Sequence, residues 1–235
     1  MSEPDLASSE RTAFFDALAG GWSSTQYGPQ GSLVPRIARF ADALQHLVPP
    51  SARVLDHGCG TGDIAAALAA HGFRVDARDA SPKMIEQARA LHAGSAVRFA
   101  VIEPTLGPSD AGADREAFDA VVCSSVLEYV DDLPAGLRQL VAMLRPGGWL
   151  LATVPDIDHP ARRHEPMQRR LMRSGAFRAL IRRTRWGTGF EMQWLSRNRL
   201  PIAQWAALLD AAQLRPVWRD CADHPLTMLV GQKSR

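Results

Sequence analysis

The sequence has few cysteines and no long hydrophobic run, and each scarcity excludes a class of protein. Its three cysteines (Cys59, Cys123 and Cys221) are far apart and have no paired spacing. This argues for a reducing compartment and against a disulfide framework or a zinc site. No run approaches the roughly 20 apolar residues of a membrane span. The stretch from Met1 to Glu10 is polar and acidic, so we expect no signal peptide and a cytoplasmic protein.

Acidic residues are scarce in one region, where the charge is strongly positive. The chain of 235 residues has a net charge of only +2, and its hydrophobic content of 46% is ordinary for a globular protein. Yet nine arginines between positions 162 and 185 are opposed by Glu165 alone. They are Arg162, Arg163, Arg169, Arg170, Arg173, Arg178, Arg182, Arg183 and Arg185. Such a local patch indicates a local anionic partner and argues against general nucleic-acid affinity.

The stretch Val54–Asp63 predicts a strand, a tight turn and a helix. An apolar pair ends at Asp56, three glycines follow at alternate positions, and an Ala-rich helical pattern begins at Ile64. Glycine suits such a turn because it tolerates positive φ and lets a ligand approach the backbone. The helix N-terminus behind it offers unpaired N–H groups. Asp56 would stand at the carboxyl end of the strand, where open α/β sheets hold ligands, and a carboxylate there suits an amine better than a phosphate.

This stretch resembles the glycine-rich motif of class I S-adenosylmethionine-dependent methyltransferases. That motif is an acidic residue followed by three alternating glycines, here Asp56, Gly58, Gly60 and Gly62. Two alternatives stay open. The segment from Gly60 to Ala65 also fits a loose dinucleotide-binding pattern, although Asp56 would face a pyrophosphate unfavourably. The turn could also bind no ligand at all.

The rest of the chain alternates predicted strands and helices. We expect strands at Arg53–Asp56, Phe73–Asp79, Ala96–Val101, Phe118–Cys123 and Trp149–Pro155, with helices at Ile64–His71, Pro82–Leu91, Asp132–Leu144 and Pro201–Ala212, and a closing hairpin of Leu214–Asp220 and Thr227–Gln232. Leu-Arg-Pro-Gly-Gly before the fifth strand is a second family signature. The expected fold is a Rossmann-like α/β sheet of seven strands, mostly parallel with one antiparallel strand, with helices on both faces.

We expect a single domain over residues 1–235. Residues 1–50 would be a lid, with a frayed start, a short helix from Ser9 to Leu18 that ends at Gly20–Gly21, a loop, and a helix from Pro35 to Leu47. Residues 51–155 would bind the cofactor. Residues 156–200 would be a basic cap containing two short helices, Glu165–Arg173 and Ala176–Arg183. Residues 201–235 would supply the last helix and the hairpin.

The resemblance implies a set of residues that bind S-adenosylmethionine. Asp79 ends the second predicted strand, where an acidic residue commonly accepts hydrogen bonds from ribose hydroxyls. It could instead cap the next helix, but Ser81-Pro82 already predicts a cap, which would leave Asp79 free. The family also implies Met84 near the adenine, Glu103 on the adenine amino group, and Ser124 in a turn beside the cofactor. Ala80, Tyr27 and Arg36 complete the set. Tyr27 and Arg36 could equally well only pack or lie in solvent.

The resemblance implies a direct in-line methyl transfer to an oxygen or nitrogen of a small-molecule acceptor. Ubiquinone-type O-methyltransferases carry Glu-Met-Leu-Glu-His after their fourth strand, where this chain has Ser125-Val126-Leu127-Glu128-Tyr129. The first carboxylate and the histidine are missing, so we predict no catalytic metal. The candidate catalytic residues are Glu128, Tyr129 and His159, the last in a loop after the fifth strand. An NAD-type oxidoreductase and a non-catalytic partner protein that binds S-adenosylmethionine remain alternatives.

The arginine-rich segment has three interpretations. It can be a solvated helical face, a receptor for an anionic carrier such as an acyl-carrier protein, or a surface that lies on an anionic membrane. We expect no nucleic-acid partner, and the sequence carries no signal for an oligomeric state.

Overall fold

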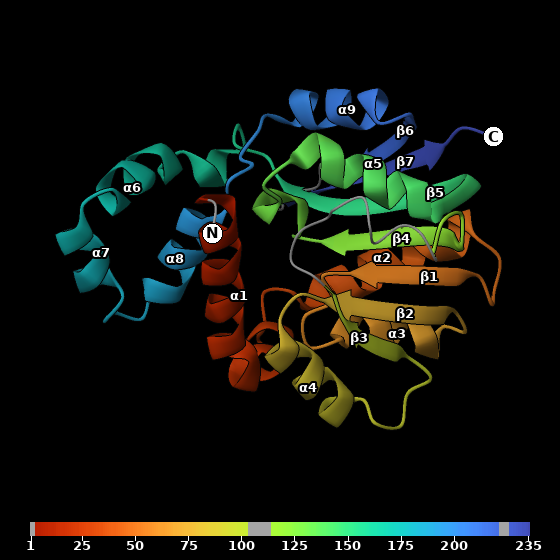
Figure 1. Cartoon of the computed structure of the whole chain (residues 1–235), viewed down its shortest axis with the longest axis horizontal. Coiled ribbons are helices and arrows are strands. Elements are labelled where there is room, and N and C mark those ends of the chain that lie inside the picture. The colour runs from red at the N-terminus through yellow and green to blue at the C-terminus, as the bar shows by residue number, and fades with distance from the viewer. Residues whose placement is uncertain (1–2, 103–113, 221–225) are drawn as a thin grey trace.

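A seven-stranded sheet forms the centre of the protein (Figure 1). The computed structural model describes residues 3–102, 114–220 and 226–235. The strand order is β3-β2-β1-β4-β5-β7-β6. The strands are β1 (Arg53–His57), β2 (Arg74–Asp79), β3 (Arg98–Val101), β4 (Phe118–Ser124), β5 (Leu144–Pro155), β6 (Leu214–Asp220) and β7 (Leu226–Lys233). Of these strands, β7 alone runs against its neighbours β5 and β6. The expected mostly parallel sheet with one reversed strand is confirmed.

Neighbouring residues of the central strands supply two separate hydrophobic cores. On β1, Val54 packs with helices α2 (Val34–Leu47) and α3 (Asp63–Ala70), whereas Leu55 packs with α5 (Leu133–Met143) and α9 (Ile202–Ala211). Successive strand side chains point to opposite faces, so a continuous apolar run requires helices on both. A further helix, α4 (Pro82–Leu91), packs against β2 and β3. No helix in the described part of the chain is long and apolar enough to cross a bilayer.

The N-terminal segment differs from the expectation. Helix α1 spans Glu3–Trp22 and continues through Gly20–Gly21, and a π-helical turn, Ser23–Tyr27, follows it. The predicted frayed start and the helix end at Gly20–Gly21 were therefore wrong. A glycine inside a helix costs about 1 kcal/mol relative to alanine. Tertiary contacts outweigh this cost: Asp16 of α1 accepts hydrogen bonds from the Ser81 hydroxyl and the Lys83 amide at the start of α4.

The insertion after β5 is mostly helical. It contains a 3₁₀ turn (Pro160–Arg162) and the helices α6 (Glu165–Met172), α7 (Gly175–Ile181) and α8 (Gly187–Leu195). Helix α8 was not expected, because its sequence GTGFEMQWL starts with two poor helix formers and shows no clear apolar stripe. We call residues 165–195 the cap. It lies beyond the carboxyl ends of the parallel strands, and α1 lies between it and the sheet (Figure 1).

The remaining boundaries agree closely with the sequence-based expectations, with one exception. Strand β5 begins at Leu144, whereas we expected it to begin at Trp149. Leu144 pairs with Phe118, and the register then shifts before Ala120 pairs with Trp149. The expected turn is therefore an irregular start of the strand, with Gly147 at φ 76°.

We expect Leu140→Ala to lower the free energy of unfolding by about 2–5 kcal/mol, because Leu140 is fully buried between α5 and the sheet. Urea unfolding followed by circular dichroism measures this. Leu91→Ala is the matched control: Leu91 ends α4 and is 52% exposed, so the change should stay within about 0.5 kcal/mol. Equal effects of the two substitutions would contradict the assigned core.

Candidate functional site

A cavity of about 710 Å³ lies where the carboxyl ends of β1, β2 and β4 meet α1 and the cap. The sheet side of its wall includes Asp56, Gly58, Gly60, Asp79 and Ser124. The opposite side comes from α1 with Phe15 and Trp22, from α2 with Arg36, and from the cap with Glu165, Trp186 and Phe190. The cavity is thus bounded by segments from the whole length of the chain, as expected at the crevice of an open α/β sheet.

The glycine-rich turn forms one edge of the cavity, and its three glycines do different things. All three have positive φ, of 74° at Gly58, 54° at Gly60 and 79° at Gly62. A Cβ added at Gly58 would lie 2.3 Å from Val126, and one at Gly62 would lie 2.6 Å from Phe99. At Gly60 the nearest atom would be 3.6 Å away, on Trp22. Gly60 therefore borders open space, whereas Gly62 serves packing and is not among the described residues that line the cavity.

Asp56 is a buried carboxyl group without a partner among the described residues. The residue is buried, and neither carboxylate oxygen has a hydrogen-bond partner among the described residues. Burial raises the pKa of this carboxyl from 3.8 to about 7, and the nearby carboxylate of Asp79 adds to the rise, against a smaller opposing effect of the Ala65 amide. A buried charge of this kind is costly unless it is paired. The carboxyl group of Asp56 therefore suits a cationic donor, which the described residues do not provide.

Arg36 presents the opposite charge to the same cavity. It is buried, and its guanidinium donates hydrogen bonds to the neutral hydroxyls of Ser124 at 3.2 Å and Ser125 at 3.0 Å. Its Nε has no partner, and none of the described carboxylates lies within ion-pair distance of it. Tyr27 lines the cavity close to both charged groups: burial raises the pKa of its hydroxyl, the charge of Arg36 lowers it and the charge of Asp56 raises it. A buried, unpaired cation thus accompanies the buried, unpaired anion.

Asp79 is held in place by backbone amides and is not free. Its carboxylate accepts from the amide of Gly60 at 2.8 Å and from that of Ser81 at 2.8 Å. Ser81 does cap α4, since its hydroxyl accepts from the Met84 amide at 3.1 Å. The expectation that this cap frees Asp79 was wrong, because Asp79 also fastens the glycine turn to the start of α4. A carboxylate has about four acceptor sites, so two amides leave capacity for ligand hydroxyls.

Of three other residues that were expected to bind the cofactor, two line the cavity and one lies outside the described residues. Ala80 and Met84 line the cavity beside Asp79. Glu103 lies outside the described residues, so its expected contact with the adenine stays a prediction.

The turn after β4 brings Glu128 and Tyr129 to the cavity wall. Glu128 is buried, and its Oε2 lies 3.4 Å from Arg199, which also pairs with Glu165 of the cap at 2.6 Å. Burial raises the pKa of Glu128, and the nearby arginines, Arg199 first, oppose this. The ring of Tyr129 packs edge-on against Phe15 of α1, with centroids 5.4 Å apart. One polar chain of contacts thus joins the core to the cap at the cavity wall.

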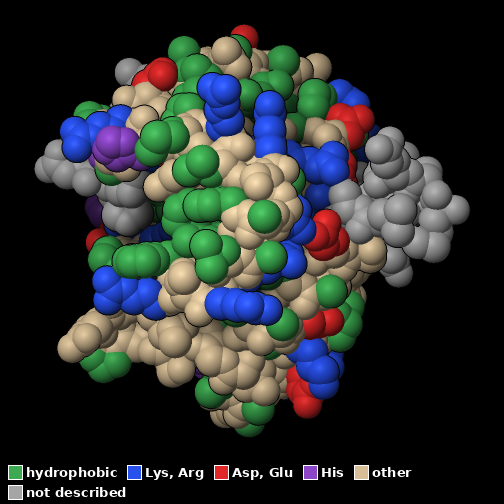
Figure 2. All heavy atoms as spheres, turned by 90° about the vertical axis from the view of Figure 1, so that its left-hand side faces the viewer, with side chains coloured by type: hydrophobic (Ala, Val, Ile, Leu, Met, Phe, Trp, Pro, Cys, Tyr) green, Lys and Arg blue, Asp and Glu red, His purple; other side chains and the backbone are tan. Residues whose placement is uncertain are grey.

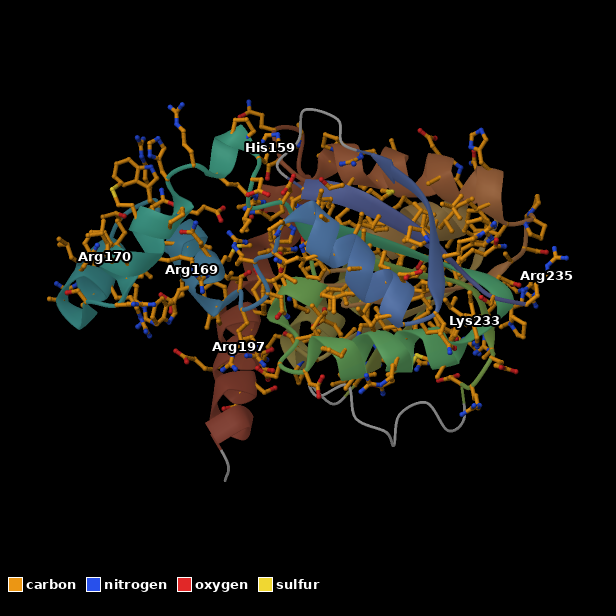
Figure 3. The ribbon with its side chains drawn as sticks, turned by 90° about the horizontal axis from the view of Figure 1, so that it is seen from above. His159, Arg169, Arg170, Arg197, Lys233 and Arg235 are labelled. Atoms are coloured by element: carbon orange, nitrogen blue, oxygen red, sulfur yellow. The ribbon has the colours of Figure 1, made fainter. Side chains whose placement is uncertain are left out.

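His159 is not among the described residues that line the cavity. Its Nδ1 accepts a hydrogen bond from the Ala161 amide at 3.2 Å, so the side chain caps the 3₁₀ turn that follows β5. Figure 3 labels it there, in the connection between β5 and α6. This geometry is that of an ordinary loop histidine and argues against a role for His159 as the catalytic base.

Sequence reasoning missed several residues of the wall. Phe15 and Trp22 come from α1, whose length was misjudged, and Phe190 comes from the unexpected helix α8. No motif marks Arg199, which lies outside the arginine-rich stretch of residues 162–185, and Glu165 was noted only as the single acidic residue of that stretch. The described residues include no group of three or more His, Cys, Asp and Glu side chains arranged to hold a metal. Whether catalysis uses a metal stays a prediction.

Comparison with known proteins places the chain in a family. The model of a family described as a methyltransferase domain matches residues 31–218. This chain belongs to that methyltransferase family. Within it, a ubiquinone biosynthesis O-methyltransferase of Xanthomonas axonopodis pv. citri is 37% identical over 140 residues, which cover 58% of this chain and 56% of the relative. The methyltransferase chain thus matches little more than half the length of this curated relative.

Solved structures share the fold at lower identity. The 1,6-didemethyltoxoflavin-N1-methyltransferase of Burkholderia thailandensis, solved with S-adenosylhomocysteine, has a TM-score of 0.61 and 22% identity over 100% of this chain and 92% of that one. The [4+2]-cyclase SpnF has a TM-score of 0.68 and 17% identity over 95% of each chain.

Family membership assigns S-adenosylmethionine as the cofactor, and the residues present fit it. The cofactor carries an α-ammonium group, an α-carboxylate and ribose hydroxyls. The cavity wall offers a buried carboxylate without a described partner at Asp56, a buried guanidinium that is bonded only to neutral hydroxyls at Arg36, and spare acceptor capacity at Asp79. The match to a methyltransferase domain also sets aside the NAD-type oxidoreductase.

The unliganded protein should lose stability as the pH rises from about 4 to about 7, through the effect of Asp56. In this window the folded protein keeps the Asp56 proton while the unfolded chain releases it, so folding becomes less favourable at higher pH. His57, whose pKa burial lowers to about 4, works in the opposite direction. Comparing the wild type with the Asp56→Asn variant isolates the contribution of Asp56 to the pH dependence of stability.

We therefore expect Asp56→Asn to be more stable than the wild type at about pH 8, by a few kcal/mol, and nearly equal to it at about pH 4. Urea unfolding at both pH values measures the difference. A constant difference between the two proteins at both pH values would contradict the raised pKa of Asp56.

Proposed function

We propose that this chain transfers a methyl group from S-adenosylmethionine to an oxygen or nitrogen of a small-molecule acceptor. The observation that carries the proposal is the pair of buried groups Asp56 and Arg36 in the wall of one cavity, where Asp56 has no hydrogen-bond partner among the described residues and Arg36 donates only to neutral hydroxyls. Both groups act on the pKa of the Tyr27 hydroxyl, in opposite directions, and a zwitterion would supply a cation to Asp56 and an anion to Arg36. In this proposal residues 51–155 hold the cofactor, and residues 1–50 and 156–200 cover it.

The residues of the site have separable tasks. Asp56 accepts from the ammonium group of the amino-acid tail and Arg36 donates to its carboxylate. Asp79 accepts from the ribose hydroxyls, while Gly60 lets the ligand lie close to the backbone. Bound S-adenosylmethionine supplies a methyl group that is already activated on a sulfonium, so the protein contributes alignment and exclusion of water. Trp22 and Phe15 of α1 close the cavity on the side away from the sheet.

Glu128 is the group we assign to the proton of the acceptor. It is the carboxylate of the turn after β4 that lines the cavity, and burial raises its pKa, which makes it a stronger base than an exposed glutamate. Arg199 acts as a positioning residue, because it holds Glu128 on one side and Glu165 on the other. Tyr129 is packed against Phe15 and shapes the wall beside Glu128.

A second candidate function is a protein that binds S-adenosylmethionine and transfers no methyl group. The similarity to a [4+2]-cyclase supports keeping it, since one fold can serve different reactions. The hypothesis that an acyl-carrier protein carries the acceptor has weaker support. Arg162, Arg169 and Arg182 of the arginine-rich segment already bind other groups of this chain, so they are less available to a carrier protein.

Asp56→Asn and Arg36→Gln should each weaken binding of S-adenosylhomocysteine by about 30-fold or more, since removing one partner of a buried charge pair costs about 2–5 kcal/mol. Titration calorimetry measures the affinity. The matched ligand is methylthioadenosine, which has the nucleoside and the sulfur but no amino-acid tail. Its affinity should change little in either variant, because the groups that Asp56 and Arg36 bind are missing from it.

Arg138→Gln is the matched control protein, because Arg138 is an exposed residue of α5 away from the cavity. It should bind both ligands as the wild type does. Equal losses for both ligands in the Asp56 and Arg36 variants would mean that these residues shape the site without binding the tail. Undetectable wild-type binding of S-adenosylhomocysteine would sink the proposed function itself.

Glu128→Gln should lower turnover by about 100-fold or more, whereas His159→Ala should keep near-full turnover. The measurement uses an acceptor identified by a labelled-methyl screen, and S-adenosylhomocysteine binding checks that both variants are folded. The remaining activity of Glu128→Gln should also lose the wild-type decline at acidic pH. If His159→Ala is the variant that loses activity, the assignment of the base is wrong.

A further inference from the structure

The sulfonium of S-adenosylmethionine carries the charge that makes its methyl group reactive, and the contacts assigned so far leave it without a partner. Asp56 accepts from the ammonium group, Arg36 donates to the carboxylate, and Asp79 accepts from the ribose hydroxyls. The sulfur joins the amino-acid tail to the ribose. Its positive charge therefore lies between Asp56 and Asp79, and its methyl group points to the side where Glu128 meets the acceptor.

The carboxylates of the cavity wall do not supply this partner. Among the described residues that line the cavity they are Asp56, Asp79, Glu128 and Glu165. Asp56 serves the ammonium group, and Asp79 accepts from two backbone amides. Glu128 and Glu165 both pair with Arg199. Each of these carboxylates thus already has a different task.

The charges around the cavity do not favour a further cation either. The described residues of its wall include five arginines, Arg11, Arg36, Arg162, Arg185 and Arg199, against the four carboxylates. On the side of the molecule that carries the cap, Lys and Arg side chains surround a group of hydrophobic ones (Figure 2). A sulfonium bound in this cavity therefore needs a short-range interaction that does not depend on a carboxylate.

Three aromatic side chains of the cavity wall contact one another in sequence. Trp22, Phe15 and Tyr129 all line the cavity. The ring centroids of Trp22 and Phe15 lie 6.0 Å apart with their planes at 80°, and those of Phe15 and Tyr129 lie 5.4 Å apart with their planes at 89°. In such edge-to-face contacts the positive edge of one ring meets the negative face of the next. We call these three side chains the aromatic row.

The aromatic row spans the part of the cavity in which the sulfonium lies. At one end, the indole Nε1 of Trp22 is the nearest atom, at 3.6 Å, to a Cβ added at Gly60. At the other end, Tyr129 directly follows Glu128 in the turn after β4. The ring of Phe15 contacts both of the other rings. A ligand that reaches from the glycine turn to the turn after β4 therefore lies along the row.

Contacts outside the aromatic row hold its rings in position. Ser23 of the π-helical turn donates from its hydroxyl to the carboxylate of Asp63 at the start of α3, at 2.6 Å. Asp16 of α1 accepts from the amide of Lys83 at the start of α4, at 3.1 Å. Burial raises the pKa of Tyr129, so that its ring stays neutral. Rings that are already placed lower the cost of ordering the site when a ligand binds.

We propose that the aromatic row binds the sulfonium of S-adenosylmethionine and thereby distinguishes this cofactor from its uncharged product, S-adenosylhomocysteine. The inference rests on the proposed function. The face of an aromatic ring attracts a cation within about 6 Å of the ring centroid, and most strongly where water is excluded. Phe15, Trp22 and Tyr129 are thus residues that determine which form of the cofactor is preferred.

The transfer step itself removes this attraction. A lone pair on the oxygen or nitrogen of the acceptor forms a bond to the methyl carbon, while the bond from that carbon to sulfur breaks. The electron pair of the broken bond stays on sulfur, which becomes a neutral thioether, and the proton of the acceptor passes to Glu128. The ring faces no longer attract the sulfur, so the row favours the exchange of product for fresh cofactor.

Titration calorimetry of the full chain with three ligands tests the proposal. S-adenosylmethionine carries the sulfonium, S-adenosylhomocysteine is neutral at that position, and sinefungin has an ammonium-bearing carbon in place of the methyl-bearing sulfur. Phe15→Leu and Tyr129→Leu should each weaken binding of both charged ligands by about fivefold or more, and binding of S-adenosylhomocysteine by less than about twofold. Sinefungin separates the effect of the charge from that of the methyl group.

Two variants serve as controls. Tyr129→Phe keeps the ring and should keep the wild-type affinities for all three ligands. Phe73→Leu should also keep them, because Phe73 is buried on the α2 and α3 side of the sheet and is not among the described residues that line the cavity. Circular dichroism should show that every variant is folded.

The outcomes separate this inference from the proposed function. Equal losses for charged and neutral ligands in Phe15→Leu and Tyr129→Leu would overturn the role of the aromatic row and leave the proposed function standing. A loss for S-adenosylmethionine alone, with sinefungin unaffected, would also overturn it, because the rings would then contact the methyl group without sensing the charge. Undetectable binding of all three ligands by the wild type would overturn the proposed function and this inference together.

Discussion

The arrangement of the site follows from the cost of burying the carboxylate of Asp56. The sheet places this group at the carboxyl end of β1, where both its oxygens are shielded from water and have no partner among the described residues. Such a charge is retained only where a ligand repays the cost of its desolvation. Gly60 in the glycine turn leaves space for a ligand beside the backbone. Arg36, from helix α2 outside the sheet, presents the opposite charge to the same cavity. Asp56 and Arg36 thus present opposite charges to the same cavity, and neither is paired with an opposite charge among the described residues.

The part of the cavity wall around Glu128 is made differently. Its charges are already paired, through Glu128, Arg199, Glu165 and Arg162, and this chain joins the turn after β4 to the cap. Ion pairs that are buried need well-placed partners, so they fix one arrangement of the cap relative to the core and tolerate few others. The two ends of the cavity therefore differ in kind: one end lacks partners for its charges, and the other supplies its own.

The sequence-based predictions were more accurate for the sheet than for the helical segments that enclose the cavity. The apolar strand patterns, the glycine turn and Ser81-Pro82 are local signals, and they predicted most boundaries of the strands and helices. One reversed strand was also expected, whereas the order of the strands was not predicted. Asp56 and Asp79 were found because a motif fixes their place at strand ends. The prediction ended the N-terminal helix at Gly20–Gly21, because local propensity favours a helix end there. In the structure α1 continues to Trp22, and it is held by contacts with α4. Arg199 and α8 could not be found, since partners far apart in sequence decide where they lie.

Helix α1 borders both ends of the cavity. Trp22 stands beside Gly60 at the cofactor end, and Phe15 packs on Tyr129 at the other end. Between them, Asp16 fastens the helix to the start of α4. One helix therefore contacts the cavity wall both near Gly60 and near Tyr129. A ligand that binds beside Gly60 and favours this position of α1 would therefore strengthen the binding of a second ligand beside Tyr129. By linkage, the second ligand would strengthen the binding of the first by the same factor.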